Sequence, residues 1–237
     1  MDRWPKGLLV DLDDTVLAFE PVSNVSWEET IGEYQAEFGA VSLNGVVEAI
    51  RAAAKAYWGD PARHRTGRLD LVQARKTIVR EAARSMNLNL GDKVISQIAM
   101  RYEEVRMQRI YPIEGAIDCL IQLRRRGIRL GLLTNGSIQT QQEKIRRFDL
   151  SPYFESVCIE QVCGVGKPDP KSYRCALDKL DLPATDVWMV GDNLEWDVLA
   201  PQRMGMHGIW VDYRNQGLPT GSPRPHRIIG SLAQLIE

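Results

Sequence analysis

The chain has 237 residues, of which 44% are hydrophobic and 26% charged, and its formal net charge is -1. Such a chain can bury a substantial core without disulfide or metal cross-links, as ordinary globular proteins do. The balanced charge argues against a uniformly basic nucleic-acid-binding surface, and no apolar stretch approaches the roughly 20 residues that a membrane-spanning helix needs.

The first apolar run, Leu8-Leu9-Val10, ends at Asp11. It is too short for the apolar region of a signal peptide and is followed by no cleavage site, so we expect a cytoplasmic protein. A short apolar run stopped by acids is typical of a buried parallel strand. The chain contains four cysteines whose spacing matches no paired zinc signature. We expect them to be reduced structural thiols: Cys119, Cys158, Cys163 and Cys175.

From about residue 23 to residue 109 hydrophobic side chains recur at three- and four-residue steps, which predicts helices almost throughout. After Pro112 helices and strands alternate. The predicted strands are 128–133, 157–159, 187–190 and 209–211. Helices are predicted over 115–126 and 169–180, and two more follow the strands 128–133 and 187–190 and end near residues 148 and 204. Repeated strand–helix units imply right-handed crossovers and a mostly parallel sheet covered on both faces.

We therefore predict a doubly wound, Rossmann-like α/β core formed by residues 1–17 and 111–237, with an inserted all-helical domain at residues 18–110. The segment Trp58–Arg68 is interpreted as a link between two helices of this insertion. From Pro61 to Arg80 there are six basic residues and one acidic residue. This stretch is either a solvated surface or a contact for an anionic part of a substrate.

Four polar clusters fall where predicted strands end or helices begin. They are Asp11-Leu12-Asp13-Asp14-Thr15, Thr134-Asn135-Gly136-Ser137, Gly164 to Pro170, and Gly191 to Asp197. Each alone has a structural explanation as a helix cap or a turn. Because ligands of open α/β sheets bind beyond the carboxyl ends of the strands, the four clusters together predict one site.

The acids of this site suit phosphoryl transfer. Asp11 and Asp192, with the backbone carbonyl of Asp13, are the natural ligands of a hard divalent cation, which offsets the repulsion between a carboxylate and a phosphate. The carboxyl group of Asp13 can protonate the leaving oxygen and later deprotonate water.

The remaining polar residues suit the transferring group. Lys167 can stabilise its charge, and Thr134, with Asn135 and nearby backbone N–H groups, can hold its oxygens. We predict Thr134 and Lys167 as catalytic residues, and Thr134, Asn135 and Lys167 as substrate-binding residues.

The order of these motifs resembles the haloacid dehalogenase (HAD) superfamily. The matching residues are Asp11, Asp13 and Thr15, then Thr134, then Lys167, then Gly191-Asp192 with Asp197. The resemblance implies an aspartyl-phosphate on Asp11, acid/base catalysis by Asp13, and Mg²⁺ at Asp11, Asp13 and Asp192. It also implies supporting roles for Thr15 and Asp197, the latter either as a residue that contacts the ligands of the metal or as a partner of the metal through water.

Asp14 stands where the family more often has glycine, a variant that also occurs in family phosphatases. By the same resemblance, the helical insertion is a cap that closes over the site and selects the substrate.

We therefore predict a Mg²⁺-dependent phosphatase that hydrolyses a small phosphorylated metabolite and has no nucleic-acid or membrane partner, as a monomer or homodimer. A haloacid dehalogenase, a phosphomutase, a signalling receiver domain and a catalytically silent metabolite-binding protein are the alternatives. Asp13 argues against a dehalogenase, which does not need an acid/base there. The helical insertion argues against a receiver domain, and the paired acids argue against a silent binder, whereas only product analysis separates a phosphomutase.

Overall fold

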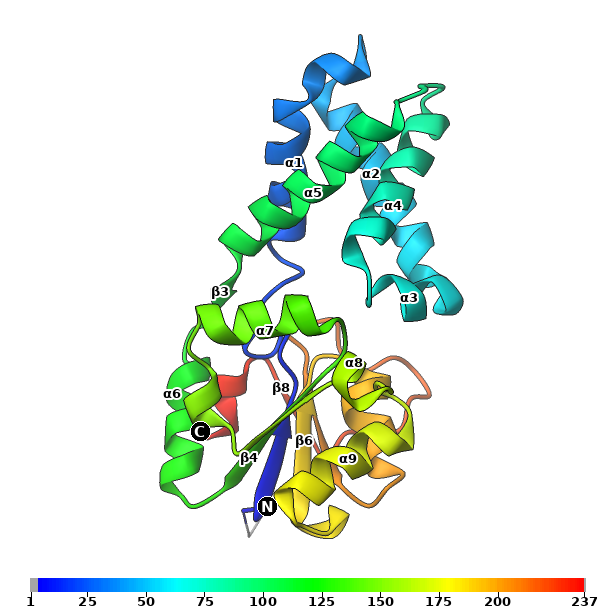
Figure 1. The fold of residues 1–237 in the computed structure, drawn as a ribbon. Coiled ribbons are helices and arrows are strands. Elements are labelled where there is room, and N and C mark those ends of the chain that lie inside the picture. The colour runs from blue at the N-terminus through cyan, green and yellow to red at the C-terminus, as the bar shows by residue number, and fades with distance from the viewer. Residues whose placement is uncertain (1–3, 237) are drawn as a thin grey trace. The chain divides into compact units, whose positions relative to one another are not determined.

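The computed structural model describes residues 4–236, and the chain divides into two compact units. The first contains the chain up to Phe19 and from Tyr111 onward, and the second is Glu20–Ile110 (Figure 1). The sequence placed the first boundary at residue 17, two residues earlier. The two units have separate hydrophobic clusters.

The first unit is built on a parallel sheet of six strands within the described residues, in the order β5-β4-β1-β6-β7-β8. The strands are β1 (Gly7–Val10), β4 (Arg129–Thr134), β5 (Ser156–Ile159), β6 (Val187–Gly191), β7 (His207–Val211) and β8 (Arg227–Ile229). The helices α6 (Ala116–Arg125) and α9 (Pro170–Leu180) lie on opposite faces of this sheet (Figure 1). The predicted doubly wound α/β fold is confirmed.

Strand order places the site. From β1 the chain runs outward through β4 to β5 and then returns past β1 to β6, β7 and β8. The direction of winding therefore reverses beside β1, and a crevice forms at the carboxyl ends of the strands flanking such a reversal. All four residues of β1 are buried, which fixes the strand from which Asp11 emerges.

Several short elements of this unit were not predicted. The strands β2 (Leu17–Ala18) and β3 (Tyr111–Pro112) pair antiparallel, and both they and β8 are too short to give a periodic pattern. A single helix ending near residue 204 was expected after the strand 187–190, but the chain forms a π-helix (Leu194–Leu199) followed by α10 (Ala200–Gln202). The remaining helices are α7 (Ile138–Arg147), α8 (Glu160–Cys163) and the 3₁₀ turns Ser151–Tyr153, Ala184–Asp186 and Leu232–Leu235.

The second unit is helical throughout its regular structure, as predicted. It consists of α1 (Ser23–Glu33), a 3₁₀ turn (Gln35–Phe38), α2 (Leu43–Gly59), α3 (Pro61–Gly67), α4 (Leu71–Ser85) and α5 (Asp92–Arg109). Its core is closed by the buried rings of Trp27 and Tyr102, which stack with centroids 3.6 Å apart. This packing fixes α1 against α5.

Helix α3 corrects the expectation of a linking segment over Trp58–Arg68. The Asp60 side chain accepts hydrogen bonds from Ala62 N (2.8 Å) and Arg63 N (3.1 Å), and Pro61 occupies the first helical turn. An aspartate cap followed by proline favours a helix start, and this local signal was overlooked. His64, expected in a loop, lies within this helix with its ring edge-on to Trp58.

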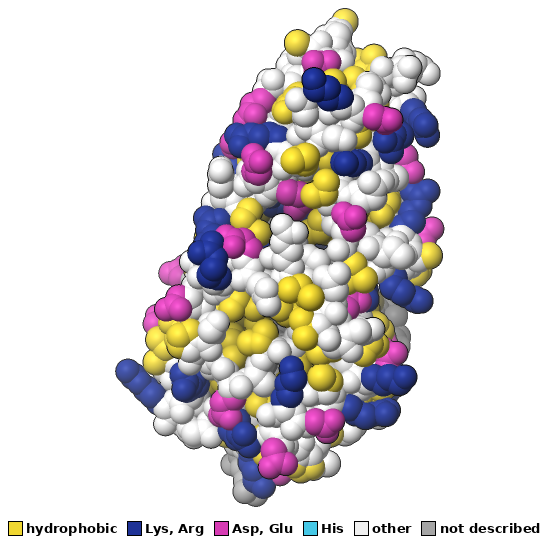
Figure 2. Space-filling view, in the orientation of Figure 1, with side chains coloured by type: hydrophobic (Ala, Val, Ile, Leu, Met, Phe, Trp, Pro, Cys, Tyr) yellow, Lys and Arg dark blue, Asp and Glu magenta, His cyan; other side chains and the backbone are white. Residues whose placement is uncertain are grey.

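Much of the positive charge predicted over residues 61–80 is compensated inside the helical unit. Ion pairs join Arg63 to Glu81 (2.9 Å), Arg75 to Glu103 (2.9 Å) and Arg80 to Asp92 (2.8 Å). Basic and acidic side chains are likewise interspersed over the face shown in Figure 2. The ion pairs favour a structural role for these arginines.

Candidate active site

Four predicted site residues meet beyond the carboxyl ends of neighbouring strands. Asp11 directly follows β1, Thr134 is the last residue of β4, and Asp192 directly follows β6. Lys167 comes from the loop between α8 and α9. The three strands lie side by side in the sheet, so their ends bring these residues to one place.

The centre of the site is the buried ammonium group of Lys167. Its Nζ lies 2.7 Å from Oδ1 of Asp11 and 2.6 Å from Oδ1 of Asp197. Burial opposes the charge on Lys167, but the two carboxylates outweigh burial and raise its pKa. Lys167 is therefore a permanent cation in contact with the predicted nucleophile.

The acids outnumber this cation. Carboxylate oxygens of Asp11, Asp192 and Asp197 all lie within 4.8 Å of one another. Burial raises the pKa of Asp11 to about 7, with Lys167 opposing it and Asp197 adding to it. Burial and the neighbouring carboxylates, first Asp11 and then Asp197, raise the pKa of Asp192 to about 9. A divalent cation bound among these carboxyl groups would favour their ionised forms.

The charge and chemistry of the cluster fit a magnesium ion. Three carboxylates facing one ammonium group leave two negative charges when all are ionised, which one divalent cation would balance. The donors are oxygen atoms only, which Mg²⁺ prefers. Asp11 and Asp192 remain the predicted side-chain ligands, with the carbonyl of Asp13.

Asp197 is held at both oxygens. Its Oδ1 accepts from Lys167, and its Oδ2 accepts from the backbone N of Asn193 at 3.0 Å. A Cβ at Gly191 would lie 2.3 Å from the Asp197 carboxyl carbon, so only glycine leaves room for this carboxylate. Asp197 thus orients Lys167, a supporting role like the one the motif implied, although its predicted contact with the metal stays a prediction.

Asp13 is held by two residues of α7 that the sequence analysis missed. Lys144 Nζ lies 2.8 and 2.7 Å from the two carboxylate oxygens of Asp13. Gln141 Nε2 donates to Asp13 Oδ2 (3.1 Å) and to the Thr134 hydroxyl (2.5 Å). Lys144 and Gln141 are buried and tie the predicted acid/base to the predicted phosphate-binding hydroxyl.

The sequence carried a signal for these residues. In α7 the buried positions are Gln141, Lys144 and Ile145, which share one face at helical spacing. Two polar side chains on the face that Ile145 buries require partners in the interior, because an unpaired buried charge is costly. That pattern directly follows the Thr134 cluster and could have pointed to the site.

Asn135 binds the segment that carries the lysine. Its Nδ2 donates to the carbonyl of Lys167 and its Oδ1 accepts from the Lys167 N–H, both at 2.8 Å. The next N–H, of Gly136, donates to the buried carboxylate of Glu160 at 2.9 Å. Both polar atoms of the Asn135 side chain therefore position Lys167, and its contact with substrate stays a prediction.

Asp14 and Thr15 shape the turn after β1. Asp14 has φ = 58°, the left-handed region in which glycine is usual and aspartate is tolerated, and its Oδ1 accepts from Phe19 N at 2.9 Å. Thr15 is fully buried, and its hydroxyl has no hydrogen-bond partner among the residues that the structure describes. Its supporting role stays a prediction.

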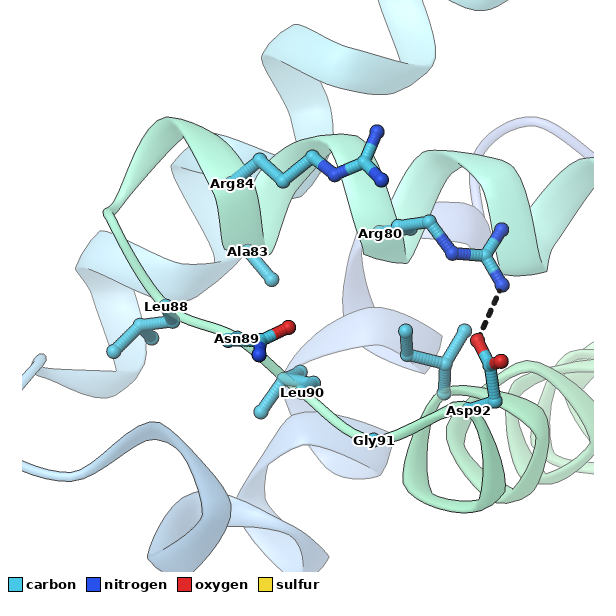
Figure 3. A pocket seen from close by; sticks show the side chains of 9 residues that line it. Arg80, Ala83, Arg84, Leu88, Asn89, Leu90, Gly91 and Asp92 are labelled. Atoms are coloured by element: carbon cyan, nitrogen blue, oxygen red, sulfur yellow. Dashed lines mark hydrogen bonds and ion pairs between the residues drawn. The ribbon is translucent and has the colours of Figure 1, made fainter.

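The helical unit contains a pocket of about 300 Å³ along the turn between α4 and α5. Figure 3 shows Arg80 paired with Asp92 at its rim, with Arg84 and Asn89 nearby. One of its basic groups is thus already neutralised, and we assign the pocket no role.

Comparison with known proteins identifies the family of this chain. The model of a hydrolase family, the haloacid dehalogenase-like hydrolases, matches residues 5–205. Phosphoserine phosphatase from Thermus thermophilus is 31% identical over 97% of both chains. Glyceraldehyde 3-phosphate phosphatase from Pyrococcus abyssi is 35% identical over 55% of both.

The fold is shared with solved structures. The protein YfnB from Bacillus subtilis, described as a HAD-hydrolase bound to magnesium, superimposes with a TM-score of 0.77 at 19% identity, over 98% of this chain and 97% of its own.

No helix within residues 4–236 is both long and apolar enough to span a bilayer.

Proposed function

The chain belongs to the haloacid dehalogenase-like hydrolases and is a phosphoric monoester hydrolase, and from this premise we propose that it is a Mg²⁺-dependent phosphatase acting through an aspartyl-phosphate on Asp11. The observation that carries the proposal is the cluster of Asp11, Asp192 and Asp197 around one ammonium group. When bound there, Mg²⁺ would offset the repulsion between the attacking carboxylate and the phosphate.

In the first step a carboxylate oxygen of Asp11 attacks phosphorus, and the bond from phosphorus to the leaving oxygen breaks. Lys167, 2.7 Å from Asp11, stabilises charge on the transferring group. Asp13 gives a proton to the leaving alcohol, and it then takes one from the water that attacks the aspartyl-phosphate. Inorganic phosphate leaves and Asp11 is restored.

Lys144 and Gln141 keep the Asp13 carboxyl group in place for both proton transfers. Thr134, bound to Gln141, presents its hydroxyl at the end of β4 for the phosphoryl oxygens. Acid/base catalysis depends on such orientation, because the proton must pass between atoms at hydrogen-bond distance.

We propose a small phosphorylated metabolite as the substrate. The names of the two relatives, phosphoserine phosphatase and glyceraldehyde 3-phosphate phosphatase, support this class. The relative that matches along 97% of the chain makes O-phosphoserine the first compound to test. The helical unit Glu20–Ile110 is proposed to serve as the cap that selects among such esters.

The test is phosphate release from O-phosphoserine, glyceraldehyde 3-phosphate and p-nitrophenyl phosphate, with Mg²⁺ or with EDTA. We expect release that requires Mg²⁺ and is lost in Asp11→Asn. The matched control is Asp178→Asn, which changes an exposed acid on α9. Hydrolysis at the wild-type rate by Asp11→Asn would contradict the mechanism. Conversion of the ester to an isomer that retains phosphate would indicate a phosphomutase. In a separate assay with 2-chloropropionate, release of chloride would indicate a dehalogenase.

A further inference from the structure

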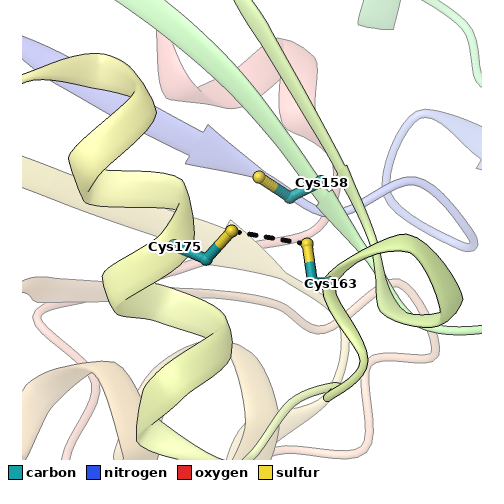
Figure 4. Close-up of side chains that lie close together, drawn as sticks. All are labelled: Cys158, Cys163 and Cys175. Atoms are coloured by element: carbon teal, nitrogen blue, oxygen red, sulfur yellow. Dashed lines mark hydrogen bonds between the residues drawn. The ribbon is translucent and has the colours of Figure 1, made fainter.

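Three of the four cysteines converge on one point and form a group separate from the carboxylate cluster. Cys158 lies in β5, Cys163 ends α8 and Cys175 lies in α9. Their sulfur atoms are all within 4.8 Å of one another, and those of Cys163 and Cys175 are 3.5 Å apart (Figure 4). Consecutive spacings of 5 and 12 residues conceal this group in the sequence, and the fold assembles it.

The spacing of the sulfur atoms suits a metal ion. With metal–sulfur bonds of about 2.3 Å, tetrahedral geometry places ligand sulfurs roughly 3.8 Å apart. The observed separations, from 3.5 Å up to at most 4.8 Å, include this value. Small rotations of the side chains would therefore complete a three-sulfur site.

The surroundings limit which ion the site can take. Cys158 is fully buried, whereas Cys163 and Cys175 are partly exposed, so an ion can enter from their side. Burial raises the pKa of Cys158 to about 12 and also raises that of Cys163, while the charge of Lys179 opposes both shifts. The ion must displace protons, which favours a strongly thiophilic cation over Mg²⁺.

The charge balance favours a divalent ion. Three thiolates, one divalent cation and the ammonium group of Lys179 sum to zero, whereas a monovalent ion would leave a negative charge in a partly buried place. Lys179 is fixed close by, since its Nζ donates to the carbonyl of Val157 at 3.2 Å.

We propose that Cys158, Cys163 and Cys175 bind a thiophilic divalent cation of the Zn²⁺ type, with water as the fourth ligand. Cys163 and Cys175 flank the loop that carries Lys167. A bound ion would thus join α8 to α9 and hold both sides of that loop. All of its protein ligands are sulfur atoms, so the site is chemically distinct from the oxygen ligands around Asp11.

The test is titration of reduced, metal-free protein with Co²⁺ in the absence of oxygen. We expect a thiolate-to-cobalt charge-transfer absorption that saturates at one ion per chain and disappears when Zn²⁺ displaces Co²⁺. Cys158→Ser, Cys163→Ser and Cys175→Ser should each weaken binding about tenfold or more. Cys119→Ser is the matched control, because this buried cysteine in α6 lies outside the group, and it should bind as wild type does.

A measurement on the wild-type protein guards against variants that fail to fold. Zn²⁺ should slow the alkylation of Cys163 and Cys175 by iodoacetamide at least tenfold, as followed by peptide mass spectrometry. The absorption should persist in Asp11→Asn, which separates this site from the catalytic one. The proposal would be overturned if Zn²⁺ left the alkylation rate unchanged and Co²⁺ gave no thiolate-to-cobalt absorption. It would also be overturned if the reduced protein bound no ion and formed a Cys163–Cys175 disulfide in air.

Discussion

The ammonium group of Lys144 lies 2.8 and 2.7 Å from the two carboxylate oxygens of Asp13, although 131 residues separate the two in the chain. Lys144 also donates to Oε1 of Gln141 at 2.9 Å, and its Nζ lies 3.8 Å from the centre of the Phe19 ring. Only 1% of the Lys144 side chain is exposed. These contacts give the ammonium group, and through it Asp13, a defined position.

Replacing Lys144 with methionine removes this positioning while keeping most of the side-chain volume. We expect kcat to fall about 10²-fold, because an Asp13 carboxyl group that is no longer held in place transfers protons less efficiently. The change in KM should be much smaller. Steady-state kinetics with O-phosphoserine would measure both constants. The pH profile of kcat should also change shape in the variant. Arg146→Met is the control on the same helix, since 74% of that side chain is exposed. A loss confined to KM would indicate that Lys144 binds substrate instead.

Lys167 should be essential for stability as well as for activity. Lys167→Met leaves Asp11 and Asp197 buried without their shared cation, and loss of one partner of a buried ion pair costs about 3–5 kcal/mol. Urea denaturation should show this loss in the free energy of unfolding. Adding Asp197→Asn to Lys167→Met removes one of the two buried carboxylates that have lost their cation. The double variant should therefore recover part of the stability and none of the activity. A double variant less stable than Lys167→Met would contradict the charge argument.

The extent to which the fold was predictable follows from segment length. Long segments with a repeating pattern, such as Arg129–Thr134 and Pro170–Leu180, were located within a residue or two. Two- and three-residue strands such as Leu17–Ala18 have no period to detect, and they form because a neighbouring strand pairs with them. The π-helix from Leu194 depends on the hydrogen bonds of Asn193 and Asp197, which no helical period describes.

The site was predictable where a residue's place in the sheet decides its role. Asp11 and Asp192 follow buried strands, so topology alone brings them together. Lys144 and the cysteine group depend instead on which helix face meets which loop. Spacing within α7 marks Gln141 and Lys144 as a buried polar pair, but the partners that they meet, like the members of the cysteine group, come from segments distant in sequence.

Gly166 should tolerate no side chain. A Cβ there would lie 2.5 Å from Cδ of Glu160 and 2.6 Å from Oδ1 of Asn135, the two groups that fix Gly136 and Lys167. Gly166→Ala should lower the free energy of unfolding by about 1–3 kcal/mol and reduce kcat, because the Lys167 backbone must move. Gly32→Ala in α1 is the control. Apart from the adjoining backbone of its own helix, no heavy atom lies within 4 Å of the added Cβ, so the substitution should raise stability by up to about 1 kcal/mol. Equal effects of the two substitutions would contradict the steric argument.

The stacked rings of His207 and His226 predict a loss of stability in acid. Their centroids are 4.1 Å apart, and Nδ1 of His226 accepts a hydrogen bond from Gly208 N at 3.2 Å. Partial desolvation of its ring, and then the neighbouring His207, lower the pKa of His226 below its ordinary 6.5. The folded state therefore prefers neutral His226. Its contribution to stability is fully present above pH 6.5 and is lost as the pH falls below that value through the lower pKa of the folded state.

His226→Phe retains an aromatic ring for stacking and removes the titrating group. Urea denaturation at about pH 7 and about pH 5 should show that wild type loses more stability on acidification than the variant does. At neutral pH the variant should be the less stable of the two, because the hydrogen bond from Gly208 is lost. The difference in stability between the two proteins should narrow in acid, since only wild type then has to keep the imidazole of His226 neutral. Stability curves that stay parallel from neutral to acidic pH would show that His226 has the same proton affinity in the folded and unfolded chain, and the prediction would be wrong.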